Sequence, residues 1–400
     1  MKHVARILST YSADTFGVCS ALYELGGMVV IHDPSGCNST YTTHDEPRWF
    51  SKPSQIFVSA LTEQDAILGN DAKLIADIEA AAKELQPRFI CLIPSQIAHM
   101  IATDCRAICH ILEKKTGIPA FTLPTNSMHY YERGIYFALQ KLAELACQSL
   151  PTTSAAPEPS APTWLSEESL ARFAQAKAPL CVNVLGATPL DFAMNGSIGS
   201  IRHWLEARGC RVTSCWAMDS DLDAILASHR ADLNLVVSYG GLGAAHILRE
   251  CAGIPYLVGV PFPHLQAAAA QSSALAGKPA YIIGETVFAT SLARALEAAL
   301  GLPCMAITAI VPMETDRALL QPGTLCLTDE CELMPVLCKA GLIIADPLYE
   351  PICPPAAFVP LPHIAFSGRL YEKDIPNLIE AAPFAAFVQK ILRTLRQNDV

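Results

Sequence analysis

Short apolar runs alternate with longer amphipathic stretches along most of the chain. In the first third, three apolar runs are typical of buried strands: residues 27–33 (GMVVIHD), 88–95 (RFICLIPS) and 118–125 (IPAFTLPT). Between them, residues 71–87 and 102–117 carry apolar side chains at helical spacing, and they end at Pro87 and Gly117. Strands that alternate with helices in this way predict a parallel sheet with helices on both faces.

The same alternation occurs in two further blocks of the chain. Residues 148–163 (QSLPTTSAAPEPSAPT) are rich in Pro, Ser, Ala and Thr, a composition typical of a connection between domains. We therefore predict an α/β fold of three Rossmann-like domains, each a mainly parallel sheet flanked by helices. The predicted bounds are 1–150 for the N-terminal α/β domain, 151–175 for the linker, 176–273 for the second domain, and 274–400 for the third domain with its C-terminal helices.

Composition narrows the classes of partner. Hydrophobic residues make up 51% of the chain and charged residues 16%, and the formal net charge is −10. The negative charge argues against nucleic acid or an anionic membrane as the main partner. No apolar run reaches about 18 residues and the N-terminus has no signal-peptide pattern, so we expect no membrane span and a cytoplasmic protein.

Fifteen cysteines are scattered over the 400 residues without any Cys-x-x-Cys pair. A secreted disulfide framework would be denser and would occupy a shorter chain. We therefore expect a reducing compartment, with most cysteines buried as small hydrophobic side chains and one or two that are reactive or ligate a metal. So many free thiols would also suit an anaerobic setting.

The loops after the predicted strands hold most of the candidate chemistry, because ligands of such sheets bind at the carboxyl ends of the strands. The first loop contains His32 and Cys37, the next contains Thr62 and Glu63, and the third contains His99. Thr62 and Glu63 also have the positions expected of helix N-capping residues, and a histidine such as His99 more often has a structural role. The chain has neither a GxGxxG fingerprint nor a Walker loop, so no motif indicates nucleotide binding.

Several segments, taken in order, resemble component 1 of nitrogenase and its relatives, including the dark-operative protochlorophyllide reductase. The segments that carry the resemblance are VVIHDPSGC, LTEQDAILGNDAKL, PSQIAHMIATD, GIPYLVGVPF and GKPAYIIGE. Each segment alone is a weak signal. Their common order and spacing over nearly the whole chain indicate the nitrogenase component 1 superfamily.

The resemblance implies a cofactor and partners. In this superfamily two homologous subunits hold an iron–sulfur cluster between them, a separate ATP-hydrolysing iron protein delivers electrons, and a small-molecule substrate is reduced deeper between the domains. Carried over by position, Cys37 becomes a ligand of a [4Fe-4S] cluster, because thiolate is a soft donor that suits iron. Gly36 would form the turn, and Ser39 and Thr40 would lie beside the cluster, where hydrogen bonds to sulfur tune its potential.

The sequence departs from the fully equipped subunits of the superfamily. Where those have further cysteines, this chain has Ile56 and Gln96, which do not ligate iron. Another ligand position falls on Gly17, near Cys19. Three interpretations follow: Cys37 is the lone ligand from this chain in a heterodimer or heterotetramer, Cys37 and Cys19 both ligate in a homodimer, or Cys37 is a buried thiol without a cluster.

Three further sets of candidates follow from the same resemblance. His44, Glu46 and Arg48, in the loop after Cys37, would lie near the cluster, either at a partner surface or on an ordinary solvated loop. Cys215 is the nearest candidate for a ligand of a larger metal cofactor, but we expect it to be a core cysteine. The candidate catalytic residues of the substrate cavity, chosen from strand-end positions, are His264, Glu285, Glu314 and His363.

The resemblance therefore implies a component-1-like subunit of an iron-protein-dependent reductase, which passes electrons through an interfacial iron–sulfur cluster to an unidentified substrate. Two alternatives stay open. The chain is a non-catalytic scaffold for metal-cofactor assembly, or it is a cluster-free ligand-binding protein of the same fold. A scaffold would bind cofactor without ATP-linked turnover, and a ligand-binding protein would hold no iron.

Overall fold

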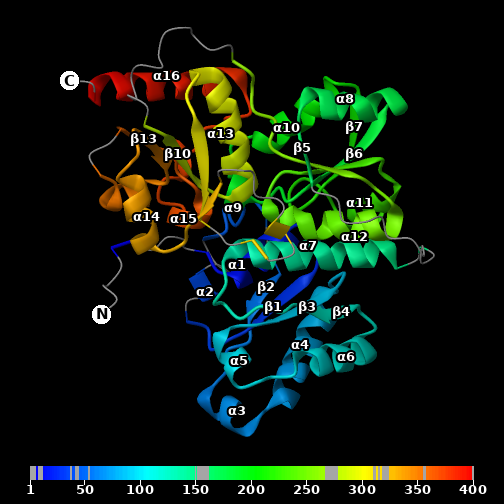
Figure 1. Cartoon of the computed structure of the whole chain (residues 1–400). Helices are drawn as coiled ribbons and strands as arrows, with labels where there is room; N and C mark the ends of the chain where they lie inside the picture. The colour runs from blue at the N-terminus through cyan, green and yellow to red at the C-terminus, as the bar shows by residue number, and fades with distance from the viewer. Residues whose placement is uncertain are drawn as a thin grey trace.

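Three separate parallel sheets, each flanked by helices, make up the fold (Figure 1). Within the described residues, every strand pairing inside these sheets is parallel. The predicted α/β fold class is confirmed. The computed structural model describes residues 6–7, 12–36, 38–40, 45–52, 55–148, 150, 162–265, 278–309, 312–313, 316–317, 324–354 and 357–398.

The first sheet has the strand order β2-β1-β3-β4. Its strands are β1 (Met28–His32), β2 (Ile56–Val58), β3 (Ile90–Pro94) and β4 (Ala120–Thr122). The helices of this unit are α1 (Asp14–Leu22), α2 (Asn38–Thr40), α3 (Glu63–Leu68), α4 (Asp71–Leu85), α5 (Gln96–Met100), α6 (Cys105–Thr116) and α7 (Tyr131–Cys147). Met28 and Val30 pack in one apolar cluster with α4 and α6, whereas Val29 and Ile31 pack in another with α1 and α7. Successive side chains of a strand point to opposite faces, so β1 is apolar throughout because helices cover both faces.

The second sheet has the order β5-β9-β8-β6-β7. Its strands are β5 (Thr163–Trp164), β6 (Leu180–Leu185), β7 (Cys210–Cys215), β8 (Leu233–Val236) and β9 (Tyr256–Val258). Its helices are α8 (Glu167–Ala176), α9 (Pro189–Phe192), α10 (Ser197–Glu206), α11 (Leu222–Leu226) and α12 (Leu242–Ala252), with 3₁₀ turns η2 (Ser228–Arg230) and η3 (Tyr239–Gly241). β5 and all but the last residue of α8 fall inside the stretch predicted as a linker, and β5 pairs with β9.

The third sheet has the order β12-β11-β10-β13-β14. Its strands are β10 (Ala280–Gly284), β11 (Cys304–Thr308), β12 (Leu325–Cys326), β13 (Leu342–Ala345) and β14 (Ala357–Pro360). Its helices are α13 (Thr286–Leu300), α14 (Glu330–Leu337), α15 (Ile364–Ser367) and α16 (Ala381–Asn398), with 3₁₀ turns η5 (Pro347–Ile352) and η6 (Glu372–Asp374).

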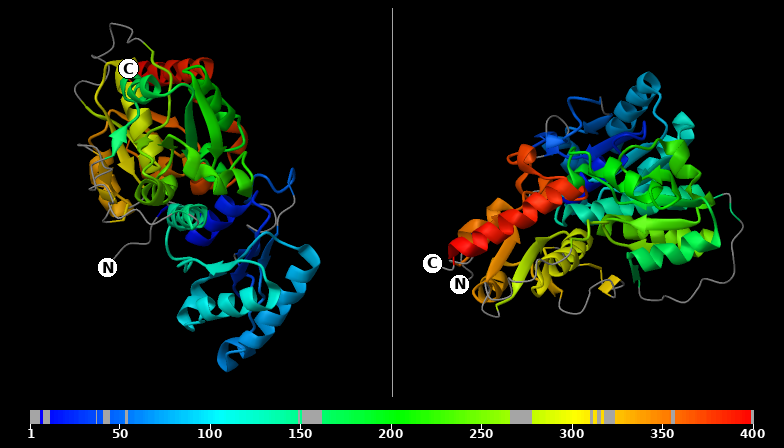
Figure 2. Two further views of the ribbon diagram at one scale, coloured as in Figure 1. Left: turned by 90° about the vertical axis from the view of Figure 1, so that its right-hand side faces the viewer. Right: turned by 90° about the horizontal axis from the view of Figure 1, so that it is seen from above.

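Helix α7 joins the first unit to the second. It crosses α1 so closely that a Cβ on Gly134 would lie 1.8 Å from the backbone oxygen of Asp14, and one on Gly17 would lie 1.9 Å from that of Tyr131. Only glycine allows two helix backbones to approach this closely. The same helix packs on α11, α12 and η3. Figure 2 shows the first unit as a lobe apart from the other two, with α1 and α7 at the junction.

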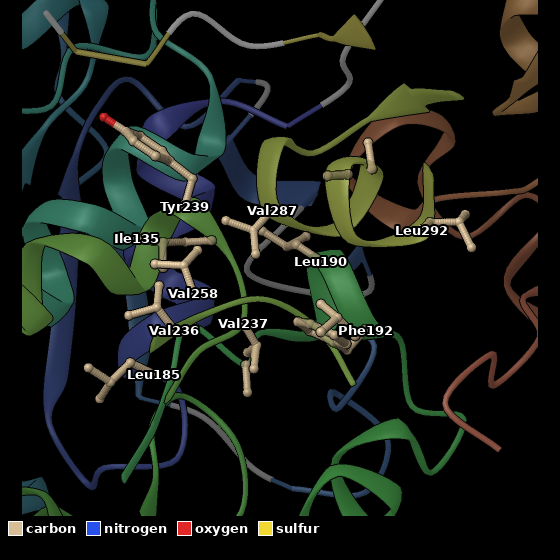
Figure 3. Close-up of a cluster of buried hydrophobic side chains, with 14 of the residues drawn as sticks. Ile135, Leu185, Leu190, Phe192, Val236, Val237, Tyr239, Val258, Val287 and Leu292 are labelled. Carbon is tan, nitrogen blue, oxygen red and sulfur yellow. The ribbon is translucent and has the colours of Figure 1, made fainter. Parts of the chain in front are cut away.

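The three units share one buried apolar core at this junction. Figure 3 shows Ile135 of α7 together with Leu185 of β6, Val236 of β8, Leu190 of α9 and Val287 of α13. All five are almost fully buried and belong to one cluster. The junction is therefore the place where loops from different sheets meet. The predicted domain bounds stay a prediction, because a core that continues across the units gives no sharp division.

No helix of the described chain has both the length and the apolar composition that a membrane span requires.

Candidate functional site

The turn after β1 is the predicted position of the cluster ligand. Cys37 itself lies outside the described residues, but the residues on either side are defined. The Asp33 carboxylate accepts a hydrogen bond from the Ser35 backbone N–H (3.1 Å), and the Ser39 hydroxyl donates to the Gly36 carbonyl oxygen (2.8 Å). Gly36 is exposed, and a Cβ there would meet nothing within 4 Å. Hydrogen bonds therefore hold the turn at both ends while Gly36 faces outward.

Other predicted ligands near this edge are less well placed. Cys19 is fully buried in α1, and burial raises the pKa of its thiol. Since the thiolate is the ligating form, this environment favours a core thiol. The backbone of Thr40 ends α2, but its side chain is outside the description. In the described part of the chain, no group of three or more His, Cys, Asp or Glu side chains is arranged to hold a metal ion.

Cys215 is a core cysteine, as expected from the sequence. It is 2% exposed at the end of β7, and burial raises the pKa of its thiol to about 12. Its position gives no reason to assign it a metal.

A cavity of about 290 Å³ opens at the ends of β1, β2 and β3. Its walls include His32, whose Nδ1 lies 2.8 Å from the Ser59 hydroxyl oxygen, and Asp65. Thr62 has the capping role expected of it: its hydroxyl oxygen accepts from the Asp65 N–H (3.1 Å), and the Asp65 carboxylate accepts from the Thr62 N–H (3.3 Å). Lys73 also pairs with Asp65. Asp65 and Lys73 are thus engaged with each other in this wall.

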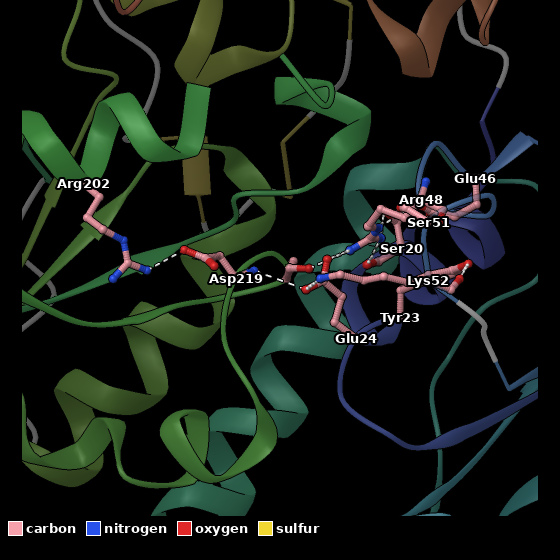
Figure 4. A network of polar contacts seen from close by, with 10 residues as sticks. Ser20, Tyr23, Glu24, Glu46, Arg48, Ser51, Lys52, Arg202 and Asp219 are labelled. Carbon is pink, nitrogen blue, oxygen red and sulfur yellow. Dashed lines mark hydrogen bonds and ion pairs between the residues drawn. The ribbon is translucent and has the colours of Figure 1, made fainter. Parts of the chain in front are cut away.

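Two charged side chains of the 45–52 segment, which follows Cys37, are buried. Arg48 is fully buried, and its guanidinium contacts the carboxylates of Glu46 (2.6 Å) and Glu24 (3.1 Å). It also donates to the backbone oxygens of Ser20 and Ala217, each at 2.8 Å (Figure 4). Glu46 is fully buried as well. The expectation of a solvated or partner-facing surface for these two side chains was wrong, because contacts from α1 and the second unit enclose them. His44 lies outside the described residues.

A second buried polar cluster lies where the three units meet. The Tyr131 hydroxyl donates to the Asp191 carboxylate at 2.5 Å, and the Nε2 atom of His363 lies 3.5 Å from the same oxygen. The Glu285 carboxylate caps α13 by accepting from Phe288 N–H (2.8 Å). These side chains come from α7, α9, the loop before α15, and the residue before α13.

Glu285 and Glu132 are the two glutamates of this cluster, and both are fully buried. Glu285 accepts a further hydrogen bond from the Tyr239 N–H (2.7 Å), yet burial and the nearby Asp191 raise its pKa to about 8. Neither carboxylate oxygen of Glu132 has a hydrogen-bond partner among the described residues. Burial, with Asp191 and Glu285 nearby, raises the pKa of Glu132 well above its usual range. We call Tyr131, Glu132, Asp191, Glu285 and His363 the acid cluster.

The four candidate catalytic residues do not form one site. Glu285 and His363 both belong to the acid cluster, and His363 lines a small cavity of about 30 Å³ together with Asp191. A space of that size holds about one or two water molecules. His264 is exposed and lines a different cavity, of about 210 Å³, between Trp164, Trp204 and Arg294. Glu314 lies outside the described residues.

The comparison with known families decides the relationship. The sequence profile of the nitrogenase component 1 type oxidoreductases matches residues 15–266, which is well over half of the chain. The chain belongs to this family. The assignment to the nitrogenase component 1 superfamily, made from the order of the matching sequence segments, is therefore confirmed.

Relatives within the nitrogenase component 1 family are distant in sequence. The chain is 26% identical over 233 residues to the nitrogenase iron-molybdenum cofactor biosynthesis protein NifE of Clostridium pasteurianum, covering 57% of this chain and 45% of that protein. It is 25% identical over 236 residues to one subunit of the light-independent protochlorophyllide reductase of Prosthecochloris aestuarii, covering 58% of this chain and 39% of that protein. The matched region thus spans less than half the length of either relative.

Solved structures share the fold over the whole chain. Nitrogenase Cp1 at pH 6.5 superimposes with a TM-score of 0.67 at 12% identity, covering 99% of this chain and 94% of that one. At this identity the likeness shows the component 1 fold alone.

Sequence reasoning missed most of the acid cluster. Glu132 lies three and seven residues before Ile135 and Leu139, both of which are buried. That spacing places a glutamate on the apolar face of α7, a signal that was available from the sequence. Asp191 follows a predicted strand, but nothing in its local sequence indicates that it contacts Tyr131 and His363. In a component 1 fold those three residues come from separate units.

Proposed function

We propose that this chain is a component-1-like subunit of an iron-protein-dependent reductase, in which Cys37 supplies one ligand to a [4Fe-4S] cluster shared with a homologous subunit. Such a cluster stores and passes on single electrons. The observation that carries the proposal is the turn around Cys37, held by hydrogen bonds at the end of β1 with Gly36 exposed, in a chain of the nitrogenase component 1 family.

A shared cluster explains why this chain has few suitable thiols. The described cysteines nearest in sequence, Cys19 and Cys91, are both fully buried, and burial raises the pKa of both thiols. The remaining ligands would then come from the homologous subunit, in a heterodimer or heterotetramer. A homodimer with two copies of Cys37 would need additional ligands, and we do not favour Cys19 for that role.

Exposed apolar side chains support an interface near the same edge. Ile67 and Leu68 of α3 are 74% and 80% exposed, and Met100 of α5 is 71% exposed. Both helices follow carboxyl ends of parallel strands, as does the turn around Cys37. Figure 1 shows α3 and α5 toward the free end of the first unit, with α2, which follows Cys37, nearer the junction. Exposed apolar groups gathered in this way are typical of surfaces that bind another protein. The homologous subunit and the ATP-hydrolysing iron protein are the partners that this proposal requires.

The reduction itself would take place near the acid cluster. Reduction of a small molecule consumes protons as well as electrons, and the cluster gathers protonatable side chains where the three units meet. Glu285 and His363 are the predicted catalytic residues that fit this place. We further propose a cytoplasmic, anaerobic protein, since the many buried thiols suit a reducing compartment.

Assembly of a metal cofactor is a second candidate function. It is favoured by the relatives named for iron-molybdenum cofactor biosynthesis. A scaffold would hold iron without ATP-linked electron uptake. The third possibility, a cluster-free ligand-binding protein, requires that no iron is bound at all.

Metal analysis of the assembled complex tests the proposal. The chain is co-expressed with an adjacent homologous subunit, purified without oxygen, and analysed for iron and sulfide. We expect about four iron atoms per dimer, a strong loss in Cys37→Ala, and no loss in Cys338→Ala, which removes an exposed thiol. A wild-type complex without iron would overturn the proposal of a shared cluster. Electron uptake that depends on MgATP and the iron protein would separate the reductase from the scaffold.

A further inference from the structure

The acid cluster has more acidic groups than its surroundings can neutralise. Tyr131, Glu132, Asp191 and Glu285 are four acidic side chains, and all are buried. In the described part of the chain, no lysine or arginine forms an ion pair with any of them, and His363 is the one basic side chain in contact. An isolated buried carboxylate is so unfavourable that the group takes up a proton instead.

Glu132 lacks the contacts of a structural residue. Both of its carboxylate oxygens are without hydrogen-bond partners in the described structure, and so are both ring nitrogens of His363. A methionine or glutamine would fill the same space at no greater energetic cost. A buried carboxyl group without a hydrogen-bond partner in the described structure therefore calls for another explanation, and proton exchange is one that needs such a group.

Neither glutamate lines the cavity beside His363, but both lie near Asp191, which does. Tyr131 and Glu132 are adjacent on α7, and Tyr131 donates to Asp191. Asp191 and His363 line the cavity of about 30 Å³. On the inner side, the Glu285 carboxylate binds the first N–H of η3, and η3 packs directly on α7.

The other titratable groups that face the cluster do not supply a balancing charge. Asp346 accepts from the His363 backbone N–H (2.8 Å), and burial raises the pKa of Asp346. Tyr239 of η3 donates its hydroxyl to Asp316 (2.9 Å), away from Glu285. The neighbourhood is thus acidic on every side except at His363.

We propose that Glu132 and Glu285 are held as neutral carboxylic acids and store protons for the reduction at this site, with Asp191 and His363 as the exchange route to the cavity. This inference rests on the proposed function. When the bound molecule accepts an electron delivered by the iron protein, it takes up a proton through His363 and Asp191, and one of the two glutamic acids replaces that proton and becomes a carboxylate. A proton from solvent, relayed by water in the cavity and by the same two side chains, then reprotonates the carboxylate, so Glu132 and Glu285 undergo no net change. Both act through other groups and are proton-storing residues, and for Glu285 this role replaces the catalytic one predicted from the sequence.

Infrared spectroscopy of the complex tests this directly. At pH 7 the wild type should show a C=O band of protonated carboxylic acid. Glu132→Gln and Glu285→Gln should each remove part of the band, and Glu132→Asp should restore a shifted one. Glu79→Gln, in the exposed pair with Lys115, is the matched control and should leave the band unchanged.

Two results would overturn the inference: no such band at pH 7, or a band unaffected by both glutamine variants in a complex that contains its iron. Thermal unfolding of each variant shows whether a lost band reflects a lost fold. A complex without iron would overturn the proposed function instead, and the metal analysis reports that separately.

Discussion

The first unit contributes residues to two buried polar clusters, the one around Arg48 and the acid cluster. The two clusters differ in how their buried charges are compensated. Around Arg48, one guanidinium meets the carboxylates of Glu46 and Glu24, and backbone oxygens of Ser20 and Ala217 take up its other N–H groups. In the acid cluster, the acidic side chains meet with one histidine, and Glu132 has no hydrogen-bond partner in the described structure.

This difference distinguishes buried charged groups that stabilise the fold from buried acidic groups that do not. A buried charge that is paired and fully hydrogen-bonded fixes the position of the elements that supply its partners, here α1, the 45–52 loop and the second unit. A buried acid without partners fixes nothing and weakens the fold unless it is protonated. The Arg48 cluster therefore positions the chain that follows Cys37, whereas the acid cluster is suited to hold protons.

The two clusters also respond to pH in opposite directions. Burial would raise the pKa of Glu24, but hydrogen bonds and charges from Lys52 and Arg48 outweigh it and lower that pKa. Its contribution to stability is present above the unfolded pKa and is lost as the pH falls through the folded value. For Glu285 the folded pKa is raised from 4.5 to about 8. Its folded state binds a proton that the unfolded chain releases, so stability falls as the pH rises between these two values.

The largest expected effect comes from removing the central cation. Arg48→Met leaves Glu46 buried without its charge partner, and we expect a loss of about 3–5 kcal/mol in the free energy of unfolding. Urea denaturation at pH 7 measures it. A loss below about 1 kcal/mol would mean that the Arg48 cluster does not hold the fold.

The pH dependence of stability should show the acid cluster. Between pH 5 and 8 we expect the free energy of unfolding to fall by a few kcal/mol, because Glu285 must give up a favourable proton. Glu285→Gln should flatten this slope, while the exposed Glu79→Gln should not. Stability that rises steadily over the same range would contradict a protonated Glu285.

Matched glutamine substitutions sharpen the comparison. Glu46→Gln removes the carboxylate that binds Arg48, and we expect a cost of about 2 kcal/mol. Glu132→Gln replaces a neutral acid by a neutral amide, so its cost at pH 7 should stay below about 1 kcal/mol. Both losses in the free energy of unfolding are measured in the same urea titrations. Equal losses for the two variants would contradict the proposed difference between the clusters.

The smallest effect is expected at the solvent side of the Arg48 network. Arg202 contacts Asp219 at 2.7 Å, and the Asp219 carboxylate is mostly exposed (Figure 4). Surface pairs contribute little because water and salt screen them. Arg202→Met should change the free energy of unfolding by no more than about 1 kcal/mol, and the change should shrink in high salt. A loss as large as that of Arg48→Met would show that burial is not what makes Arg48 important.

Elements with their own periodic pattern could be predicted from the sequence. The predicted strand at 27–33 became β1 (Met28–His32), and the helix expected to end at Gly117 does so, with Gly117 in the left-handed conformation (φ +72°). By contrast, β5 is only two residues long and lies at the end of the Pro-rich segment 148–163. It is a strand because it pairs with β9, a contact that local composition does not encode.

The candidate site was less predictable because it depends on contacts between units. Strand-end position put Glu285 and His363 among the candidate catalytic residues, and both lie in the acid cluster, but it grouped them with His264, which faces a different cavity. The burial of Arg48 was missed since a charged loop looks solvated until its partners in α1 and the second unit are known. Local patterns thus indicate which residues lie at an edge, not which edges meet.

Electron paramagnetic resonance of the dithionite-reduced, anaerobically purified complex tests the central claim most directly. If Cys37 ligates a shared cluster, the wild type should give the signal of a reduced [4Fe-4S] centre, and Cys37→Ser should change or abolish it while Cys338→Ser leaves it intact. An iron-containing complex whose signal is the same in the wild type and in Cys37→Ser would contradict the account.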